Sequence, residues 1–216
     1  MSLVDHVAAL VAAGLPEAAG ISPTELAAHA AVLPEVSGAV LAVHPSLAAP
    51  GRLAGLLRNG GRPGFVVADM TDVDDFAPIG GLAIPDLPLY LVLGATRGDE
   101  LRNASPVEAL AEIRGAGRTP LTLNEGISWL LQDPTVLQAG ACFMTIGSRK
   151  HTEAAQMDGR CPAIWISRGT GRDGPTRRNA PKVGWCWAGN RHTWLGHASA
   201  ASRLPVPGTN AGVGPR

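Results

Sequence analysis

The strongest candidate for acid–base chemistry in this sequence is His192, which lies in a polar loop near the carboxyl end of the chain. Histidine is the side chain that changes charge near neutral pH, so it suits a group that takes up and returns a proton. Asn190 and Arg191 precede it, and Trp187 and Trp194 lie on either side of the loop. Apolar walls with a few polar tips are typical of a small-molecule site. The alternative is a loop histidine that hydrogen bonds a backbone carbonyl.

The tryptophans are concentrated in the same part of the chain. Four of the five lie between residues 165 and 194. Tryptophan is a large residue that contributes heavily to the energetics of cores and pockets. Alternation along a strand would place Trp185 and Trp187 on one face of a sheet. We expect Trp185, Trp187 and Trp194 to wall a ligand pocket. The alternative is a tryptophan-rich core strand next to a loop.

The basic residues are concentrated there as well. Residues 1–148 hold 7 Lys and Arg against 15 Asp and Glu, a net charge of −8, whereas residues 149–216 hold 11 against 3, a net charge of +8. The formal net charge of zero is therefore a cancellation between two parts. This asymmetry predicts an anionic ligand in the second part, held by Arg149, Lys182 and Arg191.

A second charged motif, Arg97-Gly-Asp-Glu-Leu-Arg-Asn103, follows a predicted strand. Loops at the carboxyl ends of strands often carry functional groups. Asp99 or Glu100 could act as a general base beside an anion clamp made by Arg97 and Arg102. The same four charges could equally form a structural ion-pair network.

Two further motifs suggest cofactors that we do not predict. Gly169–Gly174 spells G-x-G-x-x-G, but Pro175 and a basic stretch follow it in place of a helix, so a flexible loop is favoured over a dinucleotide site. Cys186, His192 and His197 invite a zinc interpretation, yet their spacing lacks the paired short intervals of structural zinc sites. We therefore expect neither a cofactor nor a bound metal, and we expect Cys186 to pack as a small hydrophobic residue.

Four aspartates, at positions 69, 72, 74 and 75, follow the segment GFVVADM. Carboxylates in this arrangement could hold Mg²⁺ together with a phosphate group. The spacing of a calcium-binding loop is absent, so we favour a solvated turn that caps a helix.

The hydrophobic pattern predicts an α+β fold, with a helical amino-terminal part followed by a small mixed sheet with flanking helices. Ser-Pro-Thr-Glu at Ser22, Ser-Pro-Val-Glu at Ser105 and Thr-Leu-Asn-Glu at Thr122 are signatures of helix starts. Short β-branched runs predict buried strands. The expected strands cover residues 38–44, 64–70, 88–94, 142–146, 163–167 and 183–188. The expected helices cover 2–33, 53–58, 105–114 and 122–132. We divide the chain into a helical segment (1–34), one α+β domain (35–204) and a flexible tail (205–216).

Composition limits the class of protein. A chain of 216 residues with 45% hydrophobic residues is long enough for a substantial core. Zero net charge argues against a general nucleic-acid binder. The amino terminus has no basic region of the signal-peptide type, and no stretch reaches the ~18 apolar residues of a membrane span. Three widely spaced cysteines do not form a disulfide framework. We therefore expect a cytoplasmic protein.

Several segments resemble a family of actinobacterial proteins known only as a domain of unknown function. The most specific is GWCWAGN-x-HTWLG at residues 184–196, and the others are residues 64–74, 97–100, 118–126 and 147–149. The resemblance runs from about residue 35 to residue 203 and implies no established activity. Where the family usually has proline before His-Thr-Trp, this chain has Arg191, and the basic segment Gly169–Arg178 is longer than usual. Both differences favour an anionic ligand.

Three hypotheses about function follow. The first is an enzyme without a redox cofactor that acts on a small substrate bearing sulfate, phosphate or carboxylate. It would be a lyase or cyclase in specialised biosynthesis, with His192 as base and Arg102, Arg149 and Lys182 converging with it on one tryptophan-floored cavity. The second is a non-catalytic binding protein, or a subunit that forms a homodimer or binds another protein through oppositely charged faces. The third is a nucleic-acid-binding protein that uses the basic part and its tryptophans.

Overall fold

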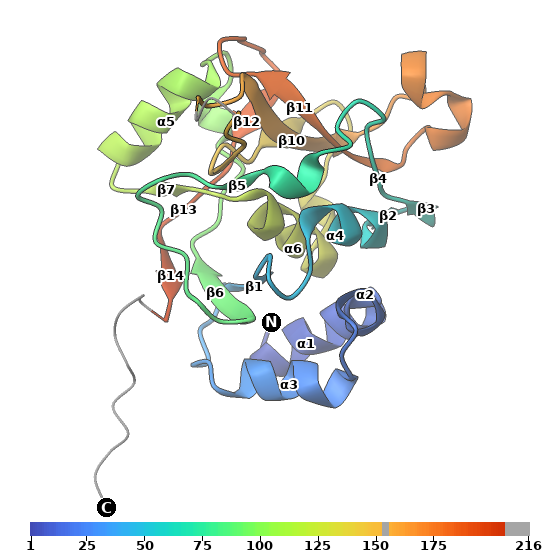
Figure 1. The fold of residues 1–216 in the computed structure, drawn as a ribbon, viewed down its shortest axis with the longest axis vertical. Coiled ribbons are helices and arrows are strands. Elements are labelled where there is room, and N and C mark those ends of the chain that lie inside the picture. The colour runs from blue at the N-terminus through green and yellow to red at the C-terminus, as the bar shows by residue number, and fades with distance from the viewer. Residues whose placement is uncertain (153–155, 206–216) are drawn as a thin grey trace, which may run out of the picture.

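The structure, a computed structural model, describes residues 1–152 and 156–205. The amino-terminal part is helical, as predicted, and forms the lower end of the molecule in Figure 1. The side chain of Ser22 accepts a hydrogen bond from the backbone of Glu25, whose carboxylate accepts one from the backbone of Ser22, which confirms the predicted helix start. Leu10 and Leu26 are fully buried in the same core as Leu41 of the first strand. The helices are α1 (Leu3–Ala12), α2 (Leu15–Ala19) and α3 (Pro23–Ala31).

The next layer is a three-stranded antiparallel sheet with the order β1-β6-β14. Two of its strands confirm the predictions for residues 38–44 and 88–94, and the third comes from the end of the described chain. The strands are β1 (Val40–Val43), β6 (Leu89–Leu93) and β14 (Ser202–Leu204).

The carboxyl-terminal part forms a five-stranded mixed sheet with the order β12-β8-β10-β11-β4. The central pair, β10 and β11, is antiparallel, whereas β4 lies parallel to β11 and β12 lies parallel to β8. The strand predicted over 64–70 is shorter than expected, because the chain after Val66 turns into a 3-10 helix at Val73–Asp75. The strands are β4 (Phe65–Val66), β8 (Cys142–Met144), β10 (Arg160–Ile166), β11 (Pro181–Trp187) and β12 (Leu195–His197).

The α+β class is therefore confirmed, although the strands form several small sheets and not one. Three further strand pairs are β2 (Arg58–Asn59) with β3 (Arg62–Pro63), β5 (Ala77–Pro78) with β9 (Ser148–Arg149), and β7 (Thr119–Pro120) with β13 (Ser199–Ala200). The remaining helices are α4 (Pro50–Leu56), α5 (Pro106–Gly115) and α6 (Leu123–Gln132). The helix starts predicted at Ser105 and Thr122 are both present as capping boxes. Of the predicted tail, residues 206–216 lie outside the described chain.

Helix α6 is the centre of the fold and is buried along almost its whole length. Its polar side chains lie four residues apart, which places them on one face of the helix. Along that face the backbone N–H groups of Leu41 and Val43 in β1 donate to the Gln132 side chain (3.0 Å) and the Ser128 hydroxyl (3.0 Å). The Asn124 side chain donates to the Val43 carbonyl at 3.0 Å. Side chains of a helix thus satisfy the backbone of a strand.

A buried ion pair joins α6 to the last strand. Glu125 and Arg203 are 1% and 6% exposed. Two nitrogens of the Arg203 guanidinium donate to the Glu125 carboxylate at 2.5 and 2.7 Å. The Tyr90 hydroxyl donates to the same carboxylate at 2.9 Å, and the Thr122 backbone N–H donates to it at 2.7 Å. This closed network connects β6, α6 and β14.

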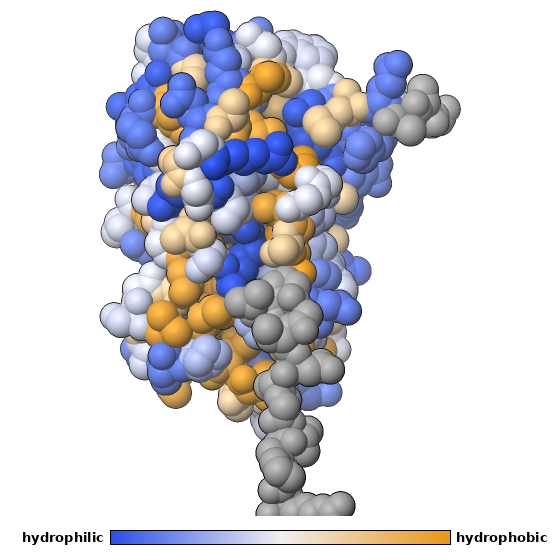
Figure 2. Space-filling model, turned by 90° about the vertical axis from the view of Figure 1, so that its left-hand side faces the viewer, coloured by the Kyte–Doolittle hydropathy of each residue, from blue (hydrophilic) through white to orange (hydrophobic). Residues whose placement is uncertain are grey.

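Two hydrophobic clusters divide the core between them. The larger one holds α6 between the three-stranded sheet and one side of the five-stranded sheet, and the smaller one packs Ala109 and Ile113 of α5 against Cys142, Cys161 and neighbouring residues. Figure 2 shows the side of the molecule on the left of Figure 1, where hydrophobic residues gather in the lower half. Within the described chain, every helix is too short or too polar to cross a membrane.

Candidate functional site

The neighbouring strands β10 and β11 provide the framework of the candidate site. Their antiparallel register places Cys161 directly opposite Cys186, and Trp165 opposite Lys182. Trp165 and Cys186 pack against the smaller hydrophobic cluster, whereas Trp185 packs against the larger one. The pair of strands therefore presents sulfur, indole and ammonium groups near one another.

The loop after β11 brings His192 back onto this strand. Nε2 of His192 lies 3.0 Å from Sγ of Cys186. The centre of the imidazole ring is 5.5 Å from that of the Trp194 ring. The backbone carbonyl of His192 accepts a hydrogen bond of 2.9 Å from the N–H of Asn103, which anchors the loop to the segment before α5. The imidazole is thus held by a thiol and an indole.

A hollow of about 250 Å³ opens next to this pair. Its walls include Cys186, Asn190, His192 and the four tryptophans at 165, 185, 187 and 194. Trp187 and Trp194 are 51% and 40% exposed, so their rings are accessible from solvent. The structure therefore brings five of the predicted site residues to one hollow: Trp185, Trp187, Asn190, His192 and Trp194.

A second hollow of about 310 Å³ adjoins the first, because Trp165 and Trp194 line both. It reaches the charged residues Arg168, Asp173 and Lys182. We call the two hollows together the tryptophan cleft. One end of the cleft carries the thiol and the imidazole, and the other end carries the ammonium and guanidinium groups.

The charged end of the cleft is partly neutralised. Nζ of Lys182 lies 2.8 Å from the Asp173 carboxylate and 4.8 Å from the centre of the Trp165 ring. Burial opposes ionisation of Asp173, but hydrogen bonds from Lys182 and Ser167 lower its pKa overall. Arg168 is exposed and, among the residues that the structure describes, makes no ion pair. This end of the cleft is therefore lined by two cationic side chains, Arg168 and Lys182, and by one anionic side chain, Asp173.

The thiol of Cys186 is half-buried. Burial raises its pKa, although hydrogen bonds from the Trp187 backbone and the Asn190 side chain act in the opposite direction. The pKa of Cys161, which lies behind it, is raised by burial to about 11. The Cys186 sulfur is consequently protonated at neutral pH and can exchange a proton with the imidazole. We expected Cys186 to be only a packing residue, and so did not predict its contact with His192. The signal in the sequence was a cysteine six residues before a histidine, with a turn between them.

The remaining predicted ligands lie elsewhere. Arg149 borders a different hollow, and its Nη2 donates to the Asp158 carbonyl. Arg102 and Arg191 border a further hollow together with Glu100. The expected convergence of Arg102, Arg149, Lys182 and His192 on one cavity is therefore wrong. Arg149 lies opposite Ala77 in the β5–β9 pair and borders a hollow that shares no lining residue with the tryptophan cleft.

Three of the four charges of the Arg97–Asn103 motif form an ion-pair network, which was one of its two interpretations, and Glu100 makes no ion pair with the described residues. A single oxygen of Asp99 lies 3.0 Å from Nη2 of Arg97 and 3.1 Å from Nη2 of Arg102. Arg191, the residue that replaces proline, pairs with Glu108 of α5. Apart from Glu100, the charged side chains of this motif and of Arg191 are therefore paired within the chain. Within the described part of the chain, the His192 ring makes no hydrogen bond with any of them and lies against Cys186 and Trp194.

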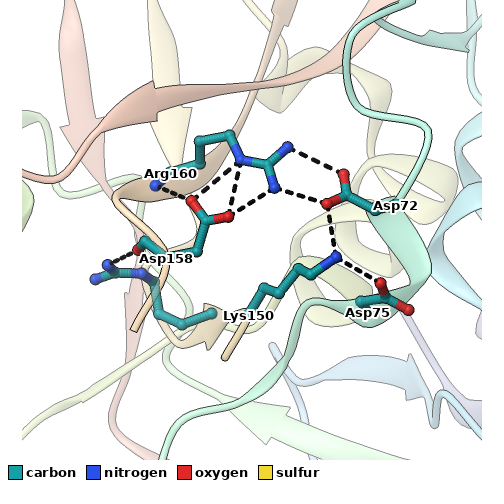
Figure 3. Close-up of polar contacts among 6 residues, drawn as sticks. Asp72, Asp75, Lys150, Asp158 and Arg160 are labelled. Carbon is teal, nitrogen blue, oxygen red and sulfur yellow. Dashed lines mark hydrogen bonds and ion pairs between the residues drawn. The ribbon is translucent and has the colours of Figure 1, made fainter. Parts of the chain in front are cut away.

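The acidic cluster serves structure in two ways. The carboxylate of Asp74 accepts a hydrogen bond of 2.7 Å from the backbone of Gly51 in the first turn of α4, whose N-cap residue, Ala49, makes no side-chain capping bond. Asp72 is bound by Arg160, and Nζ of Lys150 lies 2.8 Å from Asp72 and 2.7 Å from Asp75 (Figure 3). The lysine ammonium thus pairs with two of the four aspartates at once.

His197, the third residue of the zinc interpretation, is fully buried, and its Nε2 lies 3.1 Å from the Ala104 carbonyl. The glycine-rich segment 169–174 runs into two short 3-10 turns, Gly171–Asp173 and Pro175–Arg177, in place of the α-helix that a dinucleotide fingerprint requires.

Comparison with known protein families matches residues 9–206 to a family described as one of unknown function, DUF5701. No curated protein and no solved structure matches the chain. The match extends over the amino-terminal helices and the tryptophan cleft alike.

Proposed function

The chain belongs to DUF5701, a family of unknown function, and we propose that it is an enzyme that acts on a small anionic molecule bound in the tryptophan cleft. The observation that carries the proposal is the 3.0 Å contact between Cys186 and His192 in a hollow walled by indoles. An imidazole in this position can transfer protons within hydrogen-bond reach of a bound molecule.

The reaction we propose is an elimination. His192 removes a proton from a carbon atom of the substrate, a double bond forms, and an anionic group leaves from the neighbouring carbon. Lys182 and Arg168, at the other end of the cleft, stabilise the charge that develops on the leaving group. Trp165 and Trp194, which line both hollows, hold the body of the substrate between the two ends. This chemistry needs only proton transfer and charge stabilisation, so it uses no redox cofactor.

Asp99 and Glu100 have no part in this scheme. Both lie in the 3-10 turn Asp99–Leu101, where Asp99 is engaged with two arginines. Glu100 borders the hollow that it shares with Arg102 and Arg191. The base in our proposal is therefore His192, with the thiol of Cys186 as its hydrogen-bonding partner.

The proposal can be tested with a panel of small organic sulfates, phosphates and carboxylates, with release of the inorganic anion or formation of the double bond as the signal. We expect turnover by the native chain and a loss of about 10²- to 10⁴-fold in His192→Ala. His29→Ala, in α3, is the matched control and should react at the native rate. Equal turnover by His192→Ala and the native chain would exclude His192 as the base.

A second candidate is covalent catalysis by Cys186, which the same 3.0 Å contact favours. In that case the sulfur attacks the carbonyl carbon of an ester or thioester and the bond to the leaving group breaks. His192 takes the thiol proton and passes it to the leaving group, and water then hydrolyses the acyl–sulfur bond. Cys186→Ser separates the two candidates, because elimination survives this change and thioester formation does not. Detection of an acyl adduct on the intact protein would support covalent catalysis by Cys186.

Three finer proposals accompany the first. We propose that the string GWCWAGN-x-HTWLG is the family signature in actinobacterial members, because it holds both Cys186 and His192. We propose a cytoplasmic location, because Cys142, Cys161 and Cys186 are free thiols. We propose that a role in specialised biosynthesis suits a small anionic substrate. Labelling of the three thiols in intact cells tests the proposed cytoplasmic location.

A further inference from the structure

A separate cavity lies outside the tryptophan cleft, between α5 and the β5–β9 pair. It has a volume of about 380 Å³. Arg114, Arg149 and His151 contribute to its lining, and so do the apolar residues Leu110 and Ile146. We call it the arginine pocket. Met157, which is 48% exposed, extends its apolar wall towards solvent.

The charge of the arginine pocket has one sign. Among its described lining residues there are two arginines and a histidine, and no carboxylate. The hollow around Arg102 and Arg191 is different, because three glutamates, at positions 100, 108 and 112, line it as well. Arg114 also lies in the last turn of α5, where the helix terminus exposes carbonyl groups and a basic residue is favoured.

Arg149 has a donor that its own chain does not use. Its Nη2 donates to the Asp158 carbonyl, which holds the guanidinium in place. Its Nε is buried, and within residues 1–152 and 156–205 it has no hydrogen-bond partner. A buried donor without an acceptor costs stability, and such groups are rare in native proteins. The pocket is lined by this fixed guanidinium, which can bind an oxyanion through charge-assisted hydrogen bonds.

We propose that the arginine pocket binds a small aliphatic carboxylate. The carboxylate lies between Arg149 and Arg114, since guanidinium groups bind carboxylates through paired hydrogen bonds. The aliphatic chain lies against Leu110, Ile146 and Met157. The apolar wall favours an organic acid over inorganic phosphate as the ligand, because a bound phosphate would leave that wall exposed to water. This site is independent of the proposed function, because none of its lining residues borders the tryptophan cleft.

Calorimetric titration of the full chain with acetate, propionate, butyrate and hexanoate tests the proposal, with inorganic phosphate as a separate arm. We expect affinity to rise by about fourfold for each methylene group added over the first few members, as burial of apolar surface requires. Phosphate should bind more weakly than butyrate. Absence of carboxylate binding, or phosphate binding that equals or exceeds that of butyrate, would overturn the proposal.

Three variants locate the binding. Arg114→Gln, at an exposed helix end, and Arg149→Gln should each weaken butyrate at least tenfold. Arg62→Gln, which removes an exposed arginine of the β2–β3 hairpin, is the matched control and should bind butyrate like the native chain. Leu110→Ala should reduce the gain per methylene group and leave acetate unaffected. If Arg114→Gln, which has no structural partner to lose among the described residues, binds butyrate normally, the carboxylate does not lie where we place it. Cys186→Ser should bind normally whatever its activity.

Discussion

Arg160 and His192 both lie near Trp185, but the polar groups around Arg160 are more completely paired than those around His192. Trp185 lies 6.0 Å from the Arg160 guanidinium and also lines the hollow that His192 borders. Around Arg160, Asp72 and Asp158 bind the guanidinium, with their closest oxygens at 2.6 and 2.7 Å (Figure 3). Around His192, by contrast, the Cys186 sulfur and the imidazole contact each other at the edge of a cavity. Charges saturated within the chain hold the fold, and polar groups that face a cavity are available to a ligand.

The largest effect should come from the most completely saturated pair, Glu125 and Arg203. Arg203→Met leaves a buried carboxylate without its cation, which should lower the free energy of unfolding by about 3–5 kcal/mol. Urea unfolding of the purified variant measures this change. The double variant Glu125→Gln, Arg203→Met should recover part of the loss, because it removes the unpaired charge. If the double variant is as unstable as the single one, the cost lies in packing and not in charge.

The Arg160 network should come next. Arg160→Gln removes charge-assisted hydrogen bonds to two aspartates and should lower the free energy of unfolding by about 2 kcal/mol. Arg172→Gln is the matched control, because Arg172 pairs with Asp69 on an exposed surface and its loss should leave unfolding nearly unchanged. Equal effects of the two variants in urea unfolding would show that the network in Figure 3 contributes no more than a surface pair.

The same network predicts sensitivity to acid. Hydrogen bonds from Arg160 are the main cause of the lowered pKa values of Asp72 and Asp158. Their contribution to stability is therefore present above the unfolded aspartate value of about 4 and is lost as the pH falls through and below it. Melting temperatures between pH 5 and pH 2 should fall steeply in the native chain and less steeply in Arg160→Gln. If the melting temperatures of the two proteins fall equally steeply with pH, the acid sensitivity does not come from the Arg160 network.

A smaller effect of pH should come from His6, which faces the core from α1. Burial lowers its pKa, so folding favours the neutral form of its imidazole. The unfolded chain takes up a proton below about pH 6.5, and stability is lost as the pH falls from there. We expect the melting temperature to decrease between pH 7 and pH 5, and His6→Leu to reduce this decrease. His29→Gln should keep the native pH dependence, and a native dependence in His6→Leu would assign the effect to another group.

The smallest effect on stability should come from the tryptophan cleft. His192→Ala and Cys186→Ala remove half-buried groups that make no ion pair among the described residues, so each should change the free energy of unfolding by less than about 1 kcal/mol. The same variants should show the largest changes in ligand binding, followed through tryptophan fluorescence. A loss of stability as large as that of Arg160→Gln would make the Cys186–His192 contact structural and remove the distinction between the surroundings of Arg160 and those of His192.

Local features of the fold could be predicted from the sequence. The helix starts at Ser22, Ser105 and Thr122 depend on residues three positions apart, and all three are present. The β10–β11 pair was also predictable, because its segments are short and apolar. The polar face of α6 was a missed signal. Asn124, Ser128 and Gln132 recur every fourth residue, and such spacing on a helix indicates a common polar partner.

Features that depend on distant pairing could not be predicted in this way. The net charges of −8 and +8 suggested two opposed faces. In the described chain, however, six of the ten ion pairs join a residue before 149 to a residue at or after 149, such as Arg160 with Asp72 and Arg203 with Glu125. Much of the asymmetry is neutralised inside the molecule. The sequence showed which residues are charged, but their partners depend on the course of the chain in space.

The side chains of α6 that bond to β1 also have a consequence for self-association. An edge strand with free backbone groups is a template on which a strand from another molecule can add. The outer side of β1 is closed at Leu41 and Val43, because Asn124, Ser128 and Gln132 already bind those backbone groups. Assembly of two copies by extension of this sheet through β1 would require all three side chains to be displaced. Helix α6 therefore prevents this edge of the sheet from pairing with a strand of another molecule.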